Sequence, residues 1–274
     1  MRTLSAVVLF ALPAILPADE PAPQKEVAAS ARELALPPVR PGDDFALDKQ
    51  TFPAAALKPY AADVPLEDVQ KAPPNKYKLR TAVLKTLATV REVWATPIAV
   101  PGPAPKGKKG PRPAPLTGLL TTLRAPVTEA AKAQVREYQV LPAVGIVKLE
   151  EALRELEAVA GLRAGEPRRW QAHHDYAVAE LHARLAFLHE YDLSLGQVLK
   201  EELPDLDKAK GHDGWRLAPA TKMHSKKDVQ AVAERSRELF GKLAADHKDT
   251  PWSALARREL DRPPGLRWEP AASK

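Results

Sequence analysis

The 274-residue sequence contains no cysteine and only two methionines. The absence of cysteine excludes disulfides, thiolate metal sites, a cysteine nucleophile and a lipid anchor attached through a cysteine. The sequence also lacks a GxSxG, GxGxxG or Walker-type loop, so these sequence motifs of hydrolases and nucleotide-binding proteins are absent. The fold must therefore be stabilised by packing, and the sequence alone does not indicate an enzyme.

No apolar run reaches the ~20 residues that a membrane-spanning helix needs. The longest run extends from Leu4 to Leu16, follows Arg2 and is followed by Ala18. This layout is typical of a secretory signal peptide. We therefore predict a signal peptide over residues 1–18, a mature chain that starts near Asp19 and has no transmembrane helix, and an exported protein that is periplasmic or secreted.

Proline, in contrast, is abundant, with 28 residues, and it divides the chain. Residues 19–76 are rich in proline and poor in large apolar side chains, which predicts a segment that either lies extended along the core or is disordered. Residues 100–115 (VPGPAPKGKKGPRPAP) predict a flexible linker. The remainder of residues 77–270 predicts one helical domain, which this linker interrupts, and residues 271–274 form a polar tail.

The positive net charge of +6 is concentrated in one block. Residues 72–126 contain 10 basic residues and 1 acidic residue. Four of the basic residues lie in the linker: Lys106, Lys108, Lys109 and Arg112. They could contact a polyanion, such as nucleic acid or an anionic cell-envelope polymer, with release of counterions. They could equally hydrate a spacer, which the lack of interleaved aromatic residues for base stacking favours.

The longest helical pattern extends from Pro167 to Leu203, and we expect the rest of the chain to be arranged around it. Pro167 suits a first helical turn, and Pro204 ends the run. A helix of this length would be roughly 50 Å long, so it needs partner helices beside it. Its apolar side chains recur at steps of three and four residues: Val178, Leu181, Leu185, Leu188, Leu195 and Leu199. Asp192 and Gly196 interrupt this stripe.

A second helical pattern, residues 127–163, precedes the long helix, with Pro142 and Gly145 as a predicted kink or break. The connection from Gly161 to Pro167 is short, so the two helices should be antiparallel neighbours. Leu153 and Leu181 should face each other there. The seam of the first helix consists of Ile146, Leu149, Leu153, Leu156 and Ala160.

Three further helices are predicted, at residues 79–95, from an N-cap at Ser225 to about residue 245, and after Thr250 with Pro251 in the first turn. Residues 204–223 look irregular, and Leu266 and Trp268 form an apolar pair that should pack onto the bundle. The fold class is therefore all-α: a long antiparallel helical hairpin with flanking helices.

Four of the seven histidines lie on the long helix: His173, His174, His182 and His189. A metal site built on them is weakened by geometry, because His174 and His182 are about 12 Å apart along the axis, and there is no HExxH motif. We predict no catalytic, cofactor-binding or metal-binding residue. Arg168 and Arg169 beside Trp170 are a candidate cationic and aromatic interaction patch, with packing at the hinge as the alternative.

Two stretches have familiar patterns. KLAADHKDTPWSALARREL, from Lys242 to Leu260, resembles a helix pair of tetratricopeptide-like repeats, without a 34-residue period. RRWQAHHDYAVAELHARLAFLHEYDLSLGQVLKEELPDLD, the following GWRLAP, and TPWSALARREL with PGLRWEP resemble an uncharacterised family of exported helical proteins of planctomycete bacteria, over residues ~127–270. The resemblance implies export and a helical fold and assigns no catalytic residues.

Together these observations predict an exported, non-enzymatic helical scaffold or protein-interaction module of the cell envelope, which binds a protein partner there. Two alternatives come from other functional classes. One is a metal-dependent or other hydrolase that uses the histidine-rich helix. The other is a polyanion-binding protein that uses the basic block at residues 72–126.

Overall fold

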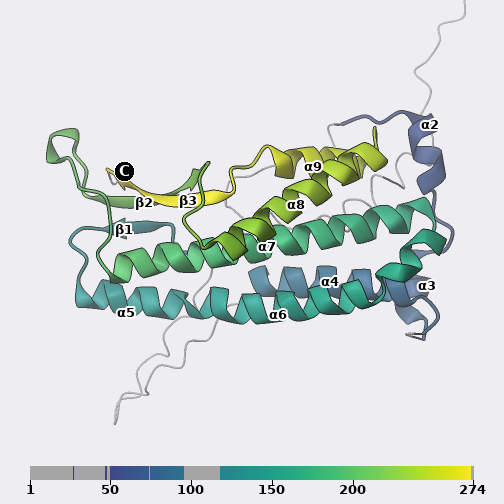
Figure 1. Ribbon diagram of the computed structural model, residues 1–274, viewed down its shortest axis with the longest axis horizontal. Coiled ribbons are helices and arrows are strands. Elements are labelled where there is room, and N and C mark those ends of the chain that lie inside the picture. Colours follow the sequence, from purple (N-terminus) through teal and green to yellow (C-terminus); the bar gives the residue numbers. More distant parts are fainter. Residues whose placement is uncertain (1–26, 28–46, 48–49, 74, 96–117, 273–274) are drawn as a thin grey trace, which may run out of the picture.

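The computed structural model describes residues 27, 47, 50–73, 75–95 and 118–272. The predicted signal peptide and the basic linker at residues 100–115 lie outside this part of the chain. The described residues are mostly helical, with a small antiparallel sheet at one end (Figure 1). None of the described helices is long and apolar enough to cross a membrane.

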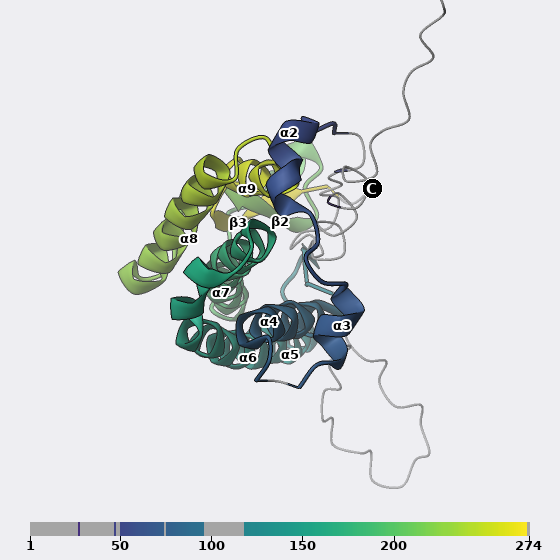
Figure 2. The same ribbon diagram turned by 90° about the vertical axis from the view of Figure 1, so that its right-hand side faces the viewer.

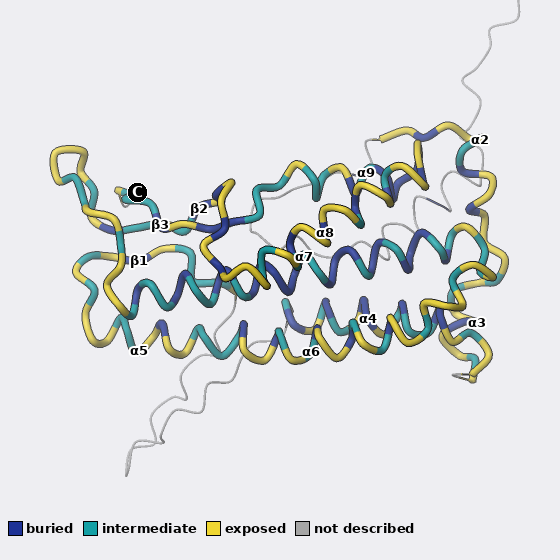
Figure 3. Tube along the Cα trace, in the orientation of Figure 1, coloured by how far each residue is buried: buried dark blue, intermediate teal, exposed yellow. Residues whose placement is uncertain are grey.

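The predicted long helix is confirmed as α7 (Arg168–Leu199), which has 32 residues and forms the middle layer of the molecule. On one side lie α4 (Lys78–Ala95), α5 (Glu129–Tyr138) and α6 (Val140–Ala158). On the other side lie α8 (Lys227–Asp246), α9 (Pro251–Leu260) and the sheet (Figures 1 and 2). Because both sides are covered, 19 residues of α7 are buried (Figure 3). The helix ends at Leu199, before the predicted stop at Pro204.

The helical hairpin of α6 and α7 is also confirmed, with the short η3 (Ala160–Gly165) as its connection. Leu149, Leu156 and Leu181 are fully buried in it. Leu153, which we expected to face Leu181 in the core, is only partly buried. The seam therefore contains Leu149 and Leu156 at its centre and Leu153 at its edge.

The break in the first arm of the hairpin is at Gln139, between α5 and α6, and not at Pro142 or Gly145. Pro142 lies in the first turn of α6, where its missing N–H has no intrahelical acceptor to lose. Gly145 has a different role from the predicted one. A Cβ there would lie 2.8 Å from Cδ1 of Leu188 and 3.1 Å from Cγ1 of Val93, so the glycine allows α6, α7 and α4 to approach closely.

The purely all-α prediction is wrong for three segments. β1 (Thr122–Arg124), β2 (Gly214–Ala220) and β3 (Gly265–Ala271) form an antiparallel sheet in that order. β3 does bury Leu266 and Trp268 against the helices as predicted. The indole N–H of Trp268 donates to the carbonyl oxygen of Ser194 at 2.8 Å, which ties β3 to α7.

Residues 50–73 lie along the core, which is one of the two predicted outcomes, but they form short helices and are not simply extended. They contain α2 (Ala54–Leu57), η2 (Lys58–Tyr60) and α3 (Leu66–Lys71). Leu57, Tyr60 and Val69 are buried in the same core as α7. This part of the proline-rich region is therefore folded onto the helical domain.

The C-terminal helices follow the prediction with one correction. Thr250 caps α9, and its hydroxyl accepts from the N–H of Ser253 in a reciprocal capping box, with Pro251 in the first turn. Ser225 is not the cap of α8, which begins two residues later. The N–H and hydroxyl of Ser225 instead donate to the buried carboxylate of Glu190 on α7, so this loop is attached to the central helix.

Candidate functional site

The histidines of α7 do not converge. The Nδ1 atom of buried His173 accepts from Nε1 of Trp252 at 3.1 Å, whereas His182 bonds through Nδ1 to a carbonyl of its own helix at 2.9 Å. His174 lies beside Asp175, and His189 is partly exposed farther along α7. Burial, and then the charges of Arg169 and His247, lower the pKa of His173. In the described part of the chain, no group of three or more histidine or acidic side chains could hold a metal ion.

A chain of polar contacts connects η2 to α7 at the end of the molecule near α2. Nδ1 of His247 lies 2.8 Å from the Tyr60 hydroxyl, and its Nε2 lies 3.3 Å from Oδ2 of Asp175. Arg163 donates to Asp175 through Nε and Nη2, both at 2.5 Å. Burial raises the pKa of Asp175, but the hydrogen bonds from His174, His247 and Arg163 outweigh it and lower that pKa far below its usual value.

The order of Asp175, His247 and Tyr60 is that of a proton relay, in which a carboxylate orients a histidine toward a hydroxyl. However, the Tyr60 side chain is buried, and its ring stacks on Trp252 with 5.1 Å between centroids. His247 is fully buried as well. The contacts therefore attach the segment at residues 50–73 to the helices.

The predicted patch of Arg168, Arg169 and Trp170 lies in the first turn of α7. Trp170 is 3% exposed, with the guanidinium of Arg80 at 5.3 Å from its ring centre. Arg168 donates to the carbonyl oxygen of Asp246 at 2.5 Å. The tryptophan packs inward at the hinge and leaves only the arginines near the surface.

The four linker residues of the predicted polyanion contact lie outside the described residues: Lys106, Lys108, Lys109 and Arg112.

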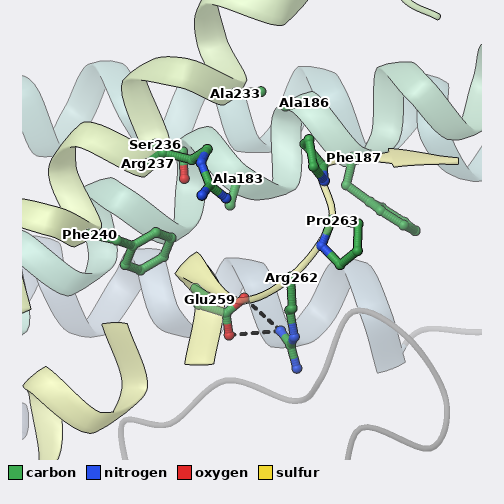
Figure 4. Close-up of a pocket in the computed structure, with 11 residues that line it drawn as sticks. Ala183, Ala186, Phe187, Ala233, Ser236, Arg237, Phe240, Glu259, Arg262 and Pro263 are labelled. Carbon is green, nitrogen blue, oxygen red and sulfur yellow. Dashed lines mark hydrogen bonds and ion pairs between the residues drawn. The ribbon is translucent and has the colours of Figure 1, made fainter. Parts of the chain in front are cut away.

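A pocket of about 80 Å³ lies between α7, α8 and the turn from α9 to β3 (Figure 4). Small side chains on α7 and α8 leave this space where the two helices pack together. Two phenylalanines and two prolines complete its apolar walls, which consist of Ala183, Ala186, Phe187, Ala233, Phe240, Pro263 and Pro264.

Three charged residues also line this pocket: Arg237, Glu259 and Arg262. Glu259 accepts hydrogen bonds from Arg258 at 2.9 and 2.6 Å and from Arg262 at 2.7 and 2.6 Å. Burial, followed by the nearby charge of Glu180, raises the pKa of Glu259. Arg237 is exposed and donates to the carbonyl oxygen of Leu260 at 3.0 Å. Within the described residues, no ion pair joins Arg237 to a carboxylate.

Two larger hollows have a different character. One, of about 270 Å³, lies at the end of the sheet beside Arg124, Asp213 and Trp215. The other, of about 190 Å³, lies between α4 and α6, where ion pairs from Lys85 to Glu155 and from Lys148 to Glu92 cross it. The side chains of these ion pairs are 40% to 63% exposed, so this second hollow is a solvated groove between two helices.

The sequence did not indicate the pocket. Its signal would have been the small residues Ala183 and Ala186, three apart on one helix, and Ala233 on another, together with the Pro263-Pro264 pair that follows the last helix. The assembled site can accept one apolar group and places an arginine at its edge.

A scan against protein-family models found no family that matches the chain, and searches of curated proteins and of solved structures found no match either.

Proposed function

We propose that this protein is an exported, non-enzymatic helical scaffold that binds a protein partner through the pocket between α7, α8 and the α9–β3 turn. The observation that carries this proposal is the size of the pocket, about 80 Å³. Sites for drug-sized molecules occupy about 300–1,000 Å³, whereas a single water takes about 30 Å³ of liquid volume. The pocket is therefore suited to one side chain of a partner.

The other polar groups support a binding role rather than catalysis. The Asp175, His247 and Tyr60 chain does not line any of the three hollows described above. A catalytic base must come within hydrogen-bond reach of the proton that it takes from a substrate. The tyrosine ring instead stacks on Trp252, and both Tyr60 and His247 are buried, so the histidine and the hydroxyl are not presented to a substrate.

We infer export from the N-terminal pattern, in which a short apolar run follows Arg2 and is followed by Ala18. Sequencing the N-terminus of the exported protein should give a start near Asp19. An intact Met1 in the membrane fraction would contradict this part of the proposal.

The binding role can be tested by photocrosslinking in the native host. A photoreactive phenylalanine analogue at Pro264, at the pocket, is compared with the same analogue at Glu157, an exposed residue of α6. We expect one defined protein adduct from position 264 and none from position 157. The adduct should disappear when Ala186→Leu fills the pocket. Equal adducts from both positions, or none from position 264, would contradict a partner at this site.

A further inference from the structure

The chemistry of the pocket indicates which part of a partner it binds. We infer that it takes one aliphatic side chain from an acidic segment of the partner, with a neighbouring carboxylate of that segment paired to Arg237. This inference rests on the proposed function and specifies the partner's chemistry.

The pocket walls indicate which side chain of the partner, here called the anchor, can enter. They are formed by alanine, phenylalanine and proline side chains, and the one hydroxyl among them, that of Ser236, already donates to the carbonyl oxygen of Ala179 at 3.1 Å. A polar side chain inserted here would leave its water shell with few groups to replace it. An aliphatic side chain makes no hydrogen bonds with water that it would have to give up, and burial of its apolar surface is favourable. A volume of about 80 Å³ lies well below the 150 Å³ of a cavity that binds benzene, which favours an aliphatic group over an aromatic one.

The charged side chains around the pocket indicate which residues of the partner lie next to the anchor. Around the pocket, Arg258 and Arg262 hold Glu259, and one layer deeper Arg184 donates to Glu180 at 2.9 Å. Arg237 adds a further positive charge at the edge, and its hydrogen bond to Leu260 engages only a backbone carbonyl. Among the residues that line the pocket, the two arginines, Arg237 and Arg262, outnumber the one carboxylate, Glu259, so the excess charge of the lining is positive. A guanidinium matches a carboxylate in shape and charge.

The position of Arg237 makes it available to such a carboxylate. Figure 4 shows its side chain extending from α8 toward the α9–β3 turn, beside the apolar walls. The next arginine back along α8, Arg235, already pairs with Glu238 at 3.0 Å and does not line the pocket. Arg235 is therefore a matched control, because its removal takes the same charge from the same helix.

The experiment titrates three capped peptides into the intact protein and follows the ¹³C-labelled alanine methyl groups by NMR. The first probe, acetyl-Gly-Asp-Leu-Asp-Gly-amide, carries the anchor and the carboxylates. The second replaces both Asp residues by Lys, and the third replaces Leu by Gly. N-acetyl-L-leucine serves as a free acid without a peptide context.

We expect the first peptide to shift the methyl signals of Ala183, Ala186 and Ala233, with a Kd in the millimolar range that is usual for small, solvated ligands. The lysine peptide should bind at least threefold more weakly, and the glycine peptide should give no shifts. Arg237→Gln should weaken the acidic peptide about threefold, whereas Arg235→Gln should leave its affinity unchanged.

Three results would overturn the inference: equal binding of the acidic and lysine peptides, equal loss in both arginine variants, or shifts with N-acetyl-L-leucine but not with the acidic peptide. The last result would identify a free acid, not a peptide segment, as the occupant. If the peptides fail while the crosslink from Pro264 persists, the proposed function stands and the partner's chemistry differs. If both fail, the proposed function fails as well.

Discussion

The pocket itself can be tested by filling it from within the chain, independently of any partner. Ala186 lines the pocket, whereas Ala179, two turns earlier on the same helix, is fully buried where α8 packs and lines none of the three hollows. Replacing either alanine by leucine adds the same three carbons at a buried position of α7. The two variants therefore differ mainly in whether space exists for the added atoms.

The expected sizes follow from the volume. Residual cavities cost about 24 cal/mol per Å³, so filling about 80 Å³ could stabilise the fold by up to about 2 kcal/mol. The hollow is partly open to solvent, which reduces this gain, and we expect Ala186→Leu to change the free energy of unfolding by about 0 to +2 kcal/mol. Ala179→Leu has no such space and should cost about 1–3 kcal/mol through overpacking.

Urea denaturation of both variants measures this difference directly, because the two substitutions should leave the slope of the unfolding transition unchanged. The midpoint should rise or stay constant for Ala186→Leu and fall for Ala179→Leu. If Ala186→Leu lowers the midpoint as much as Ala179→Leu does, α7 and α8 are in close contact at Ala186 and the proposed binding site does not exist.

Three further predictions concern the core. Burial lowers the pKa of His173 in the folded state, so the unfolded state takes up this proton at a higher pH. As the pH falls below about 6.5, the free energy of unfolding should therefore decrease by up to about 1.4 kcal/mol per pH unit. Melts at several pH values should show a shallower decrease in His173→Gln. Glu190→Gln should cost about 2–4 kcal/mol in urea melts, because its carboxylate accepts from two backbone N–H groups at 2.8 and 2.9 Å and from the Ser225 hydroxyl; a loss below about 0.5 kcal/mol, typical of surface sites, would contradict that role. Leu181→Ala should cost about 2–5 kcal/mol and Leu153→Ala less, since only Leu181 is fully buried; equal losses in urea melts would place both leucines in the core.

The helical hairpin was predictable because its signals are local. The apolar spacing of α7, Pro167 before its first turn and the short connection to α6 all lie within neighbouring residues. The same holds for α9, where Thr250 and Pro251 specify the start of the helix. Caps and periodicity act within one or two turns, so the sequence displays them directly.

The sheet was missed because its prolines argue against strands in isolation. Pro219 lies in the central strand, where a missing N–H would normally break the ladder. However, β1 pairs only with Gly214–Arg216, so Pro219 lies beyond the end of that ladder. How far β1 extends along β2 depends on the tertiary structure and cannot be read from local sequence. Without that information, the segment around β2 looks irregular.

The pocket could not be predicted for a similar reason. It depends on which faces of α7 and α8 meet and on where the α9–β3 turn crosses them. Alanines on each helix are equally compatible with close packing, as at Ala179, and with a hollow, as at Ala186. Only the positions of Phe187, Phe240 and the two prolines distinguish the cases.

The most direct test of the pocket as the partner-binding site uses the protein identified by crosslinking from Pro264. Isothermal titration calorimetry would compare its affinity for the wild-type chain, Ala186→Leu and Arg235→Gln. Burying one aliphatic side chain contributes about 1.5–3 kcal/mol, and 1.4 kcal/mol is about a tenfold change in affinity. We therefore predict at least a tenfold loss for Ala186→Leu and no change for Arg235→Gln. An unchanged affinity in Ala186→Leu would contradict the account and move the binding site elsewhere on the molecule.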